Sequence, residues 1–149
     1  MSSEQLLSTR RGPSEHLLWS ELACHDGTEY PAQWRDDRAV TLAVTFEDVR
    51  ALLGGEPIVI LSGYRTPSYN AKLEGAAQHS QHVEGRALDI WHPSIEPADI
   101  FAKLRATQAE GGLPLLGGLG LYRSFVHMDV RPKFPKGHLA VWGGPGVSL

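Results

Sequence analysis

The sequence is short of cysteine and has no strong excess of either charge, and each shortage excludes a class of protein. Cys24 is the single cysteine among 149 residues, so no internal disulfide can form and the fold cannot depend on one. We expect Cys24 to be a small buried side chain rather than a reactive thiol. The net charge is −3 and there is no basic block, which argues against nucleic acid as a partner.

Long hydrophobic runs are also missing. Residues 1–20, "MSSEQLLSTRRGPSEHLLWS", contain no apolar run of the kind that a signal peptide needs. No stretch reaches the roughly 20 apolar residues that cross a bilayer. We therefore expect a chain that is synthesised in soluble form in the cytoplasm and has no membrane partner. If it acts at the cell wall, a route other than a standard leader must deliver it.

Internal repeats and low-complexity linkers are absent as well, so the length favours one domain over residues 1–149. A chain of this size, with 42% hydrophobic residues, can bury a core without disulfides or other cross-links. We expect a monomer. Residues 1–15 are polar, and we expect them either to be flexible or to fold over the surface.

Local patterns predict several helices. The segment "HLLWSELACHDG" has helix-like apolar spacing. Residues 45–54 are expected to form a helix that Thr45 caps and Gly54 ends, with acidic residues in its first turn. Thr66 and Pro67 predict the start of a short helix. Residues 97–112, which begin with Pro97 and end in two glycines, give the clearest amphipathic pattern.

Other segments predict strands. The run "PIVILSG" is typical of a buried strand, and "RALDIWHP" of a second one. Residues 117–132 indicate two short strands joined at Arg123 and Ser124, as in a hairpin. The tail, residues 137–149, is rich in glycine and proline, with Trp142 as its expected anchor. Because strands and helices are interspersed and the last pair is antiparallel, we expect an α+β fold with a small antiparallel sheet and flanking helices.

The segment "SQHVEGRALDIW", residues 80–91, contains the first candidate site. His82 is expected in a turn and Asp89 in the strand that follows. The small residues Gly85 and Ala87 allow a tight connection, so that both side chains can converge. Imidazole and carboxylate are both zinc ligands, although a zinc site needs at least one more. A hydrogen-bonded pair without a metal is the alternative.

His127 is the candidate third ligand. In the strand "FVHMDV" the side chains of Phe125, His127 and Asp129 share one face, and the intervening residues share the other. If this strand lies beside the one with Asp89, three ligands come together. Three protein ligands leave one coordination position open, which is typical of catalytic zinc, whereas structural zinc usually has four protein ligands.

Three segments, in this order, resemble one family. They are "SGYRTPSYNAKL", the run with His82 and Asp89, and "GGLGLYRSFVHMDV". All three resemble motifs of the zinc D-alanyl-D-alanine carboxypeptidase and dipeptidase family, and "SELACHDG" resembles the opening of its short cell-wall endopeptidase and phage branch. The resemblance covers about residues 18–132. It implies the fold shared by these peptidases and the hedgehog signalling domain.

The resemblance also implies function. It makes His82, Asp89 and His127 the ligands of one zinc ion, and it places Arg65 where the family binds substrate. A guanidinium suits a carboxylate, although a structural salt bridge is the alternative for Arg65. Ser80 is expected to orient a ligand or the substrate.

The implied substrate is a peptide of bacterial peptidoglycan, as in an endolysin-like carboxypeptidase or endopeptidase. A cytosolic dipeptidase, or a non-catalytic zinc-containing module of a phage or cell wall, is the alternative.

The general base is where the sequence departs from the family. Ser124 stands where many members have a glutamate, and Phe125 stands where lysostaphin-type relatives have a histidine. Asp129 is our candidate base, because it shares a strand face with His127. Its alternative role is to accept a hydrogen bond from a ligand imidazole. Glu84 is expected to face solvent, and His79 to be a surface histidine or to line the site.

Overall fold

The computed structural model describes residues 11–73, 76–77, 79–133 and 137–149. Its centre is a five-stranded sheet in the order β1-β2-β4-β3-β5. The strands are β1 (Val59–Ser62), β2 (Ala87–Trp91), β3 (Gly118–Leu121), β4 (Val126–Asp129) and β5 (Ala140–Gly143). The first three pairings in this order are antiparallel and the pairing of β3 with β5 is parallel. The α+β class predicted from the sequence is confirmed.

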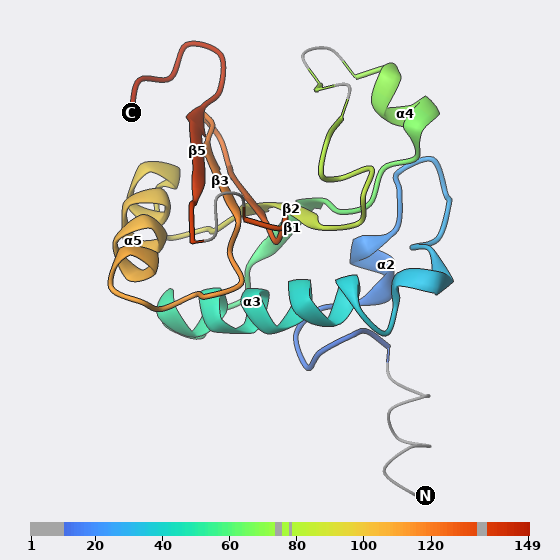
Figure 1. Cartoon of the computed structure of the whole chain (residues 1–149), viewed down its shortest axis with the longest axis horizontal. Helices are drawn as coiled ribbons and strands as arrows, with labels where there is room; N and C mark the ends of the chain where they lie inside the picture. The colour runs from blue at the N-terminus through green and yellow to red at the C-terminus, as the bar shows by residue number, and fades with distance from the viewer. Residues whose placement is uncertain (1–10, 74–75, 78, 134–136) are drawn as a thin grey trace, which may run out of the picture.

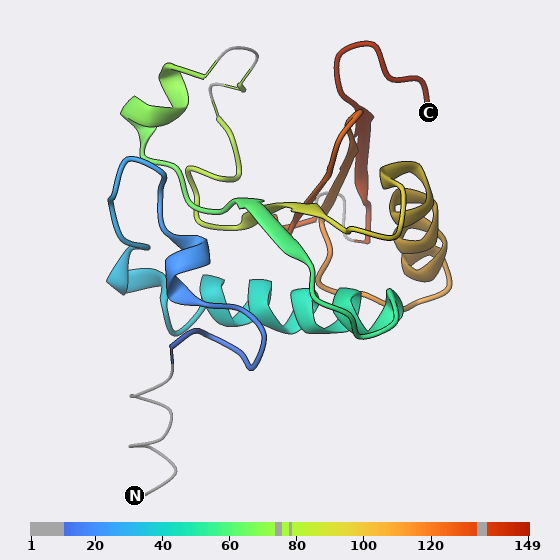
Figure 2. The ribbon, with the colours of Figure 1, turned by 180° about the vertical axis from the view of Figure 1, so that it is seen from behind.

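Two long helices, α3 (Arg38–Leu52) and α5 (Pro97–Ala109), support the sheet. Figures 1 and 2 show α3 running along one side of the molecule and α5 standing beside β3. The shorter helices are α2 (Trp19–Leu22), the 3-10 helix η1 (Ala32–Trp34) and α4 (Pro67–Ala71). Among the described residues, no helix combines the length and the apolar character needed to cross a membrane.

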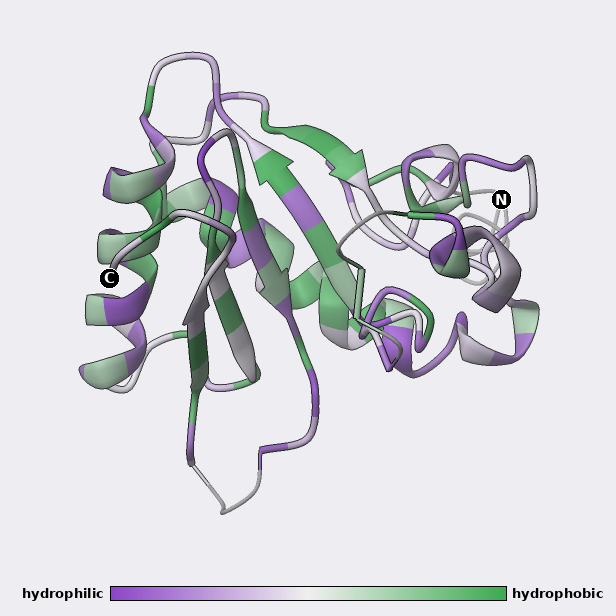
Figure 3. Cartoon of the chain, turned by 90° about the horizontal axis from the view of Figure 1, so that it is seen from above, coloured by the Kyte–Doolittle hydropathy of each residue, from purple (hydrophilic) through white to green (hydrophobic). Residues whose placement is uncertain are grey.

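The two faces of the sheet differ in chemistry. Alternate residues of the strands are buried with the inner sides of α3 and α5 in one core, which includes Leu88, Ile90, Leu119, Val126, Met128, Leu42, Phe46, Ile100 and Leu104. Burial of each such side chain contributes about 1.5–3 kcal/mol. Asp89 of β2 and His127 and Asp129 of β4 alternate with these core residues and therefore point to the other face, and Figure 3 shows hydropathy changing along the strands. The core therefore fixes the strands that carry the candidate ligands.

The predicted start of α3 is wrong. The helix begins at Arg38, whose backbone N–H donates a hydrogen bond to the Asp37 side chain. The acidic residues predicted for the first turn therefore lie in the interior of the helix. The Thr45 hydroxyl donates to the Thr41 carbonyl one turn earlier instead of capping. The predicted end holds, with Gly54 at φ +98°. The predicted start of α4 is also confirmed, because Thr66 accepts from the Tyr69 N–H and Pro67 is the first helical residue.

Two predictions for the sheet also need correction. The strand β1, predicted to be buried, is the edge of the sheet, with Val59 42% and Leu61 39% exposed. The tail contributes β5, which we did not predict and which makes the sheet mixed rather than antiparallel, because it joins β3 in parallel. The hairpin of β3 and β4 is confirmed, as is the burial of Cys24. The prediction for residues 1–15 falls largely on 1–10, outside the described residues.

Candidate metal centre

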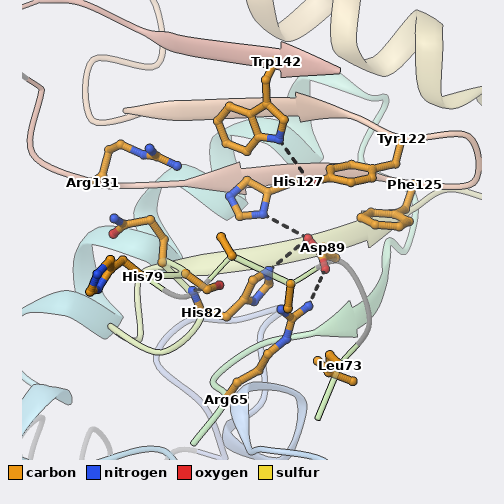
Figure 4. Close-up of a pocket in the computed structure, with 14 residues that line it drawn as sticks. Arg65, Leu73, His79, His82, Asp89, Tyr122, Phe125, His127, Arg131 and Trp142 are labelled. Atoms are coloured by element: carbon orange, nitrogen blue, oxygen red, sulfur yellow. Dashed lines mark hydrogen bonds and ion pairs between the residues drawn. The ribbon is translucent and has the colours of Figure 1, made fainter. Parts of the chain in front are cut away.

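The three candidate ligands lie together on the polar side of the sheet. Asp89 on β2 and His127 on β4 are direct cross-strand partners, and His82 lies in the turn before β2. One ligand atom from each lies within 4.8 Å of the others, and all three residues are buried. Figure 4 shows their side chains pointing toward one another. The predicted convergence of two strands and one turn therefore occurs.

The two imidazoles are each held from behind by an acceptor. His82 Nδ1 lies 2.7 Å from the carbonyl oxygen of Gly63, and His127 Nε2 lies 2.7 Å from Asp129 Oδ2. Because a carbonyl and a carboxylate accept, these ring nitrogens carry the protons. When the rings are neutral, each therefore turns an unprotonated nitrogen toward the site.

These unprotonated nitrogens face a third acceptor. His82 Nε2 and His127 Nδ1 each lie 3.1 Å from Oδ1 of Asp89. Three buried lone pairs aimed at one point repel one another unless a cation or a proton lies among them. Two imidazole nitrogens and one carboxylate oxygen form a ligand set that zinc accepts, so the donor chemistry fits the metal.

Asp129 is a buried support for His127. Its carboxylate is fully buried and also accepts from Arg131, with Nε 2.9 Å from Oδ1 and Nη2 2.7 Å from Oδ2. Burial raises the pKa of Asp129, but the hydrogen bonds from Arg131 and His127 outweigh it and lower the pKa to about 2. Asp129 thus contacts the nitrogen of His127 that points away from Asp89. These are the contacts expected of the positioning role rather than of a general base.

Glycines make room for this arrangement. A Cβ atom on Gly118, the cross-strand partner of Asp129, would lie 2.6 Å from the Asp129 Cγ. Gly85, with φ +69°, lies so close to the Trp34 ring that a Cβ atom would be 2.6 Å from Cε3. Gly63 packs against the backbone of Leu22, whose Cα would lie 2.8 Å from a Cβ atom at this position. Arg131 and the carbonyl of Gly63 were not predicted as parts of the site, because no local sequence pattern connects them with His127 or His82.

Arg65 lies beside the metal ligands. Its three nitrogens donate to Ser62 Oγ, Asn70 Oδ1 and Asp89 Oδ2, each at 3.2 Å. The contact with Asp89 is a salt bridge, the structural role that was the alternative to substrate binding for Arg65. Arg65 also lines the neighbouring cavity. Burial acts to raise the pKa of Asp89, but the imidazoles of His127 and His82, when protonated on the nitrogens that face it, donate to its carboxylate and hold that pKa well below its usual range.

A cavity of about 580 Å³ opens onto the three ligands. Its walls include Arg65, Ser80, His79 and an aromatic side formed by Tyr122, Phe125 and Trp142. Ser80 is buried and its hydroxyl accepts from the His82 N–H. Ligand pockets commonly have about 300–1,000 Å³, so a short peptide can enter.

The remaining predicted residues lie apart from the ligands. Glu84 is exposed and pairs with Arg38, Nη1 to Oε2 being 3.1 Å, in agreement with the expectation that it faces solvent. Ser124 is exposed in the turn between β3 and β4. His79 is exposed at the rim of the cavity that it helps to line.

A comparison with protein-family models matches residues 15–129 to peptidase M15. The chain belongs to the peptidase M15 family. M15 peptidases are zinc-dependent, so this chain is a member of a metallopeptidase family and has a His–Asp–His group that could hold the metal. The resemblance noted in the sequence is thereby confirmed. No curated protein matches the chain. The family match ends at Asp129, before Arg131 and β5.

Proposed function

We propose that this M15 peptidase holds one zinc ion and hydrolyses peptide bonds of bacterial peptidoglycan, as a D,D-carboxypeptidase or an endopeptidase. The proposal includes the fold type of the hedgehog domain and the D-alanyl-D-alanine peptidases. The observation that carries it is the convergence of three buried ligand atoms, from His82, Asp89 and His127, in the lining of a peptide-sized cavity.

Each residue then has a role. Bound zinc would supply a Lewis acid that polarises the scissile carbonyl and lowers the pKa of water. Gly63 and Asp129 keep the two imidazoles in the tautomers that leave a nitrogen free for the metal. Arg65 uses three of its five N–H groups internally. The other two can bind a substrate carboxylate or carbonyl from the cavity wall, beside Ser80.

The test combines metal analysis with product analysis. We expect the purified protein to bind one zinc ion and to cleave peptidoglycan-derived muropeptides, as seen by mass spectrometry. Chelation and His127→Ala should abolish both metal binding and cleavage. A zinc-loaded wild type that leaves cross-linked and uncross-linked muropeptides and free D-alanyl-D-alanine intact would overturn the peptidase assignment. Cleavage of the free dipeptide alone would indicate a dipeptidase.

A non-catalytic zinc module is the second candidate. Two observations favour it. Ser124 is exposed at the position where the family often has a glutamate as general base. The carboxylate of Asp129 already accepts hydrogen bonds from Arg131 and His127. Asp129→Asn tests the predicted base directly. Loss of cleavage with unchanged zinc affinity would support Asp129 as the base, whereas weaker zinc binding would support its positioning role. Tight binding of intact sacculi with no cleavage by the wild type would favour the module.

A further inference from the structure

We propose that the Tyr122 hydroxyl donates a hydrogen bond to the carbonyl oxygen of the scissile peptide bond, and that Trp142 positions this hydroxyl. The inference rests on the proposed peptidase function. It assigns a catalytic role to a tyrosine and a positioning role to a tryptophan that lies beyond the family match, which ends at residue 129.

Trp142 reaches the metal centre across a glycine. On the sheet, Gly120 of β3 lies between His127 of β4 and Trp142 of β5. A Cβ atom on Gly120 would lie 2.6 Å from Nε1 of the indole, so only a glycine allows the indole to lie over this strand. The ring centroids of Trp142 and His127 are consequently 5.0 Å apart. Arg131 covers the indole, with Cζ 5.0 Å from the ring centroid.

The indole fixes the oxygen of Tyr122. Trp142 Nε1 donates to the Tyr122 hydroxyl at 3.1 Å. The phenol ring is fixed as well, because it stacks on Phe125 with centroids 4.5 Å apart and an interplanar angle of 8°. Figure 4 shows these aromatic side chains beside His127. Tyr122 is therefore held both at its ring and at its oxygen.

The proton of this hydroxyl is available to a ligand. An indole N–H can only donate, so the phenol oxygen accepts and its own hydrogen must point elsewhere. Within the described part of the chain, no acceptor lies in hydrogen-bond contact with that hydrogen. Tyr122 lines the same cavity as the three candidate ligands. The cavity thus presents an oriented O–H donor beside the metal centre.

Such a donor matches a need of the reaction. Attack on an amide carbonyl builds negative charge on its oxygen, and one fixed hydrogen-bond donor at that oxygen contributes about 10²–10³ in kcat. The donor acts more strongly in the transition state than on bound substrate, so its loss lowers kcat more than it raises KM. A purely structural bond between the end of β3 and β5 would affect stability alone.

The experiment is a double-mutant cycle on the zinc-loaded protein, with muropeptide cleavage as the readout. Tyr122→Phe should lower kcat by about 100-fold with KM and zinc stoichiometry nearly unchanged. Trp142→Phe should keep the aromatic wall but lose the N–H, and lower kcat by a smaller factor. Because Trp142 acts through the hydroxyl, the double variant should match Tyr122→Phe. Tyr69→Phe, outside the cavity lining, is the matched control.

A binding measurement gives a second readout. A phosphinate analogue of D-alanyl-D-alanine carries the charged tetrahedral centre that the hydroxyl should contact, whereas the dipeptide itself does not. Calorimetry should show weaker phosphinate binding by Tyr122→Phe, by about the factor lost in kcat, and unchanged dipeptide binding. Equal phosphinate affinity, full kcat in Tyr122→Phe, or multiplicative losses in the double variant would each overturn the inference. An inactive wild type would instead count against the peptidase function, and phosphinate binding would still test Tyr122.

Discussion

Replacing Gly118 with alanine tests whether the buried carboxylate of Asp129 controls the metal centre. The new Cβ atom would lie 2.6 Å from Cγ of Asp129 and 2.6 Å from Oδ1. Non-bonded carbon atoms prefer about 3.5–4.0 Å, so the carboxylate must move by about 1 Å. Its hydrogen bonds to His127 Nε2 and Arg131 Nη2, both 2.7 Å, would then lengthen beyond about 3.2 Å, the usual upper limit for N–H···O bonds.

The expected cost follows from what these bonds are worth. Hydrogen bonds to charged groups contribute about 1.5–3 kcal/mol each, and part of each survives the displacement. We therefore expect Gly118→Ala to lower the free energy of unfolding of the metal-free protein by about 3 kcal/mol. Groups that orient a metal ligand typically change metal affinity by about 10–100-fold, and we expect zinc affinity to fall by such a factor.

Urea unfolding measures the stability and competition with a chelating dye measures the zinc affinity. Leu119→Ala is the matched control, because Leu119 is the next residue of β3, is fully buried and packs in the core on the opposite face. It should cost about 2–5 kcal/mol with zinc affinity nearly unchanged while the protein stays folded. Unchanged zinc affinity in Gly118→Ala, or equal losses in both variants, would refute the positioning role of Asp129.

Three further predictions concern other parts of the chain. Burial tends to raise the pKa of Glu47, but hydrogen bonds from Ser14 and His16 outweigh it and lower that pKa. The stabilisation is therefore full above the unfolded pKa of about 4.3 and disappears as pH falls through the folded value. Thermal unfolding should show Glu47→Gln about 1 kcal/mol less stable at pH 7 and equal to wild type at the acid end; a constant difference would contradict this. Arg65→Lys, which cannot reproduce donation to Ser62, Asn70 and Asp89 together, should lower kcat/KM at least about 10-fold in muropeptide assays, and wild-type kinetics would make Arg65 dispensable. Glu84→Gln should retain activity within about twofold, because Glu84 pairs with Arg38 on the surface; a large loss of kcat would identify Glu84 as the missing base.

Local sequence predicted the parts of the fold that local forces decide. Leu88 and Ile90 of β2 and Val126 and Met128 of β4 are buried in the core, and the polar residues that alternate with them point to the other face, as alternation requires. Pro67 and Thr66 begin α4 as expected. The candidate ligands were found because His82 and Asp89 are close in sequence and His127 stands out in an apolar strand.

The errors lie where a distant segment outweighs local preference. Thr45 is a good capping residue, yet the core that α3 forms with β2 and β4 extends the helix back to Arg38. The apolar composition of β1 is typical of a central strand, but whether a strand is central or at the edge depends on the order in which strands pair. The tail gave no strand signal, and β5 exists because β3 offers it a parallel partner.

The sequence by itself determined the α+β class, the family and three candidate ligands, because these depend on composition, short-range periodicity and motifs along one stretch of chain. Only the tertiary structure decided which groups surround those ligands. Asp129, which also accepts from Arg131, contacts the ring nitrogen of His127 that points away from Asp89. The carbonyl of Gly63 contacts the corresponding nitrogen of His82. Trp142 reaches Tyr122 across Gly120. These contacts join segments that are distant in the chain. Their geometry is set by the sheet register and by the space left because Gly118 and Gly120 have no Cβ atom.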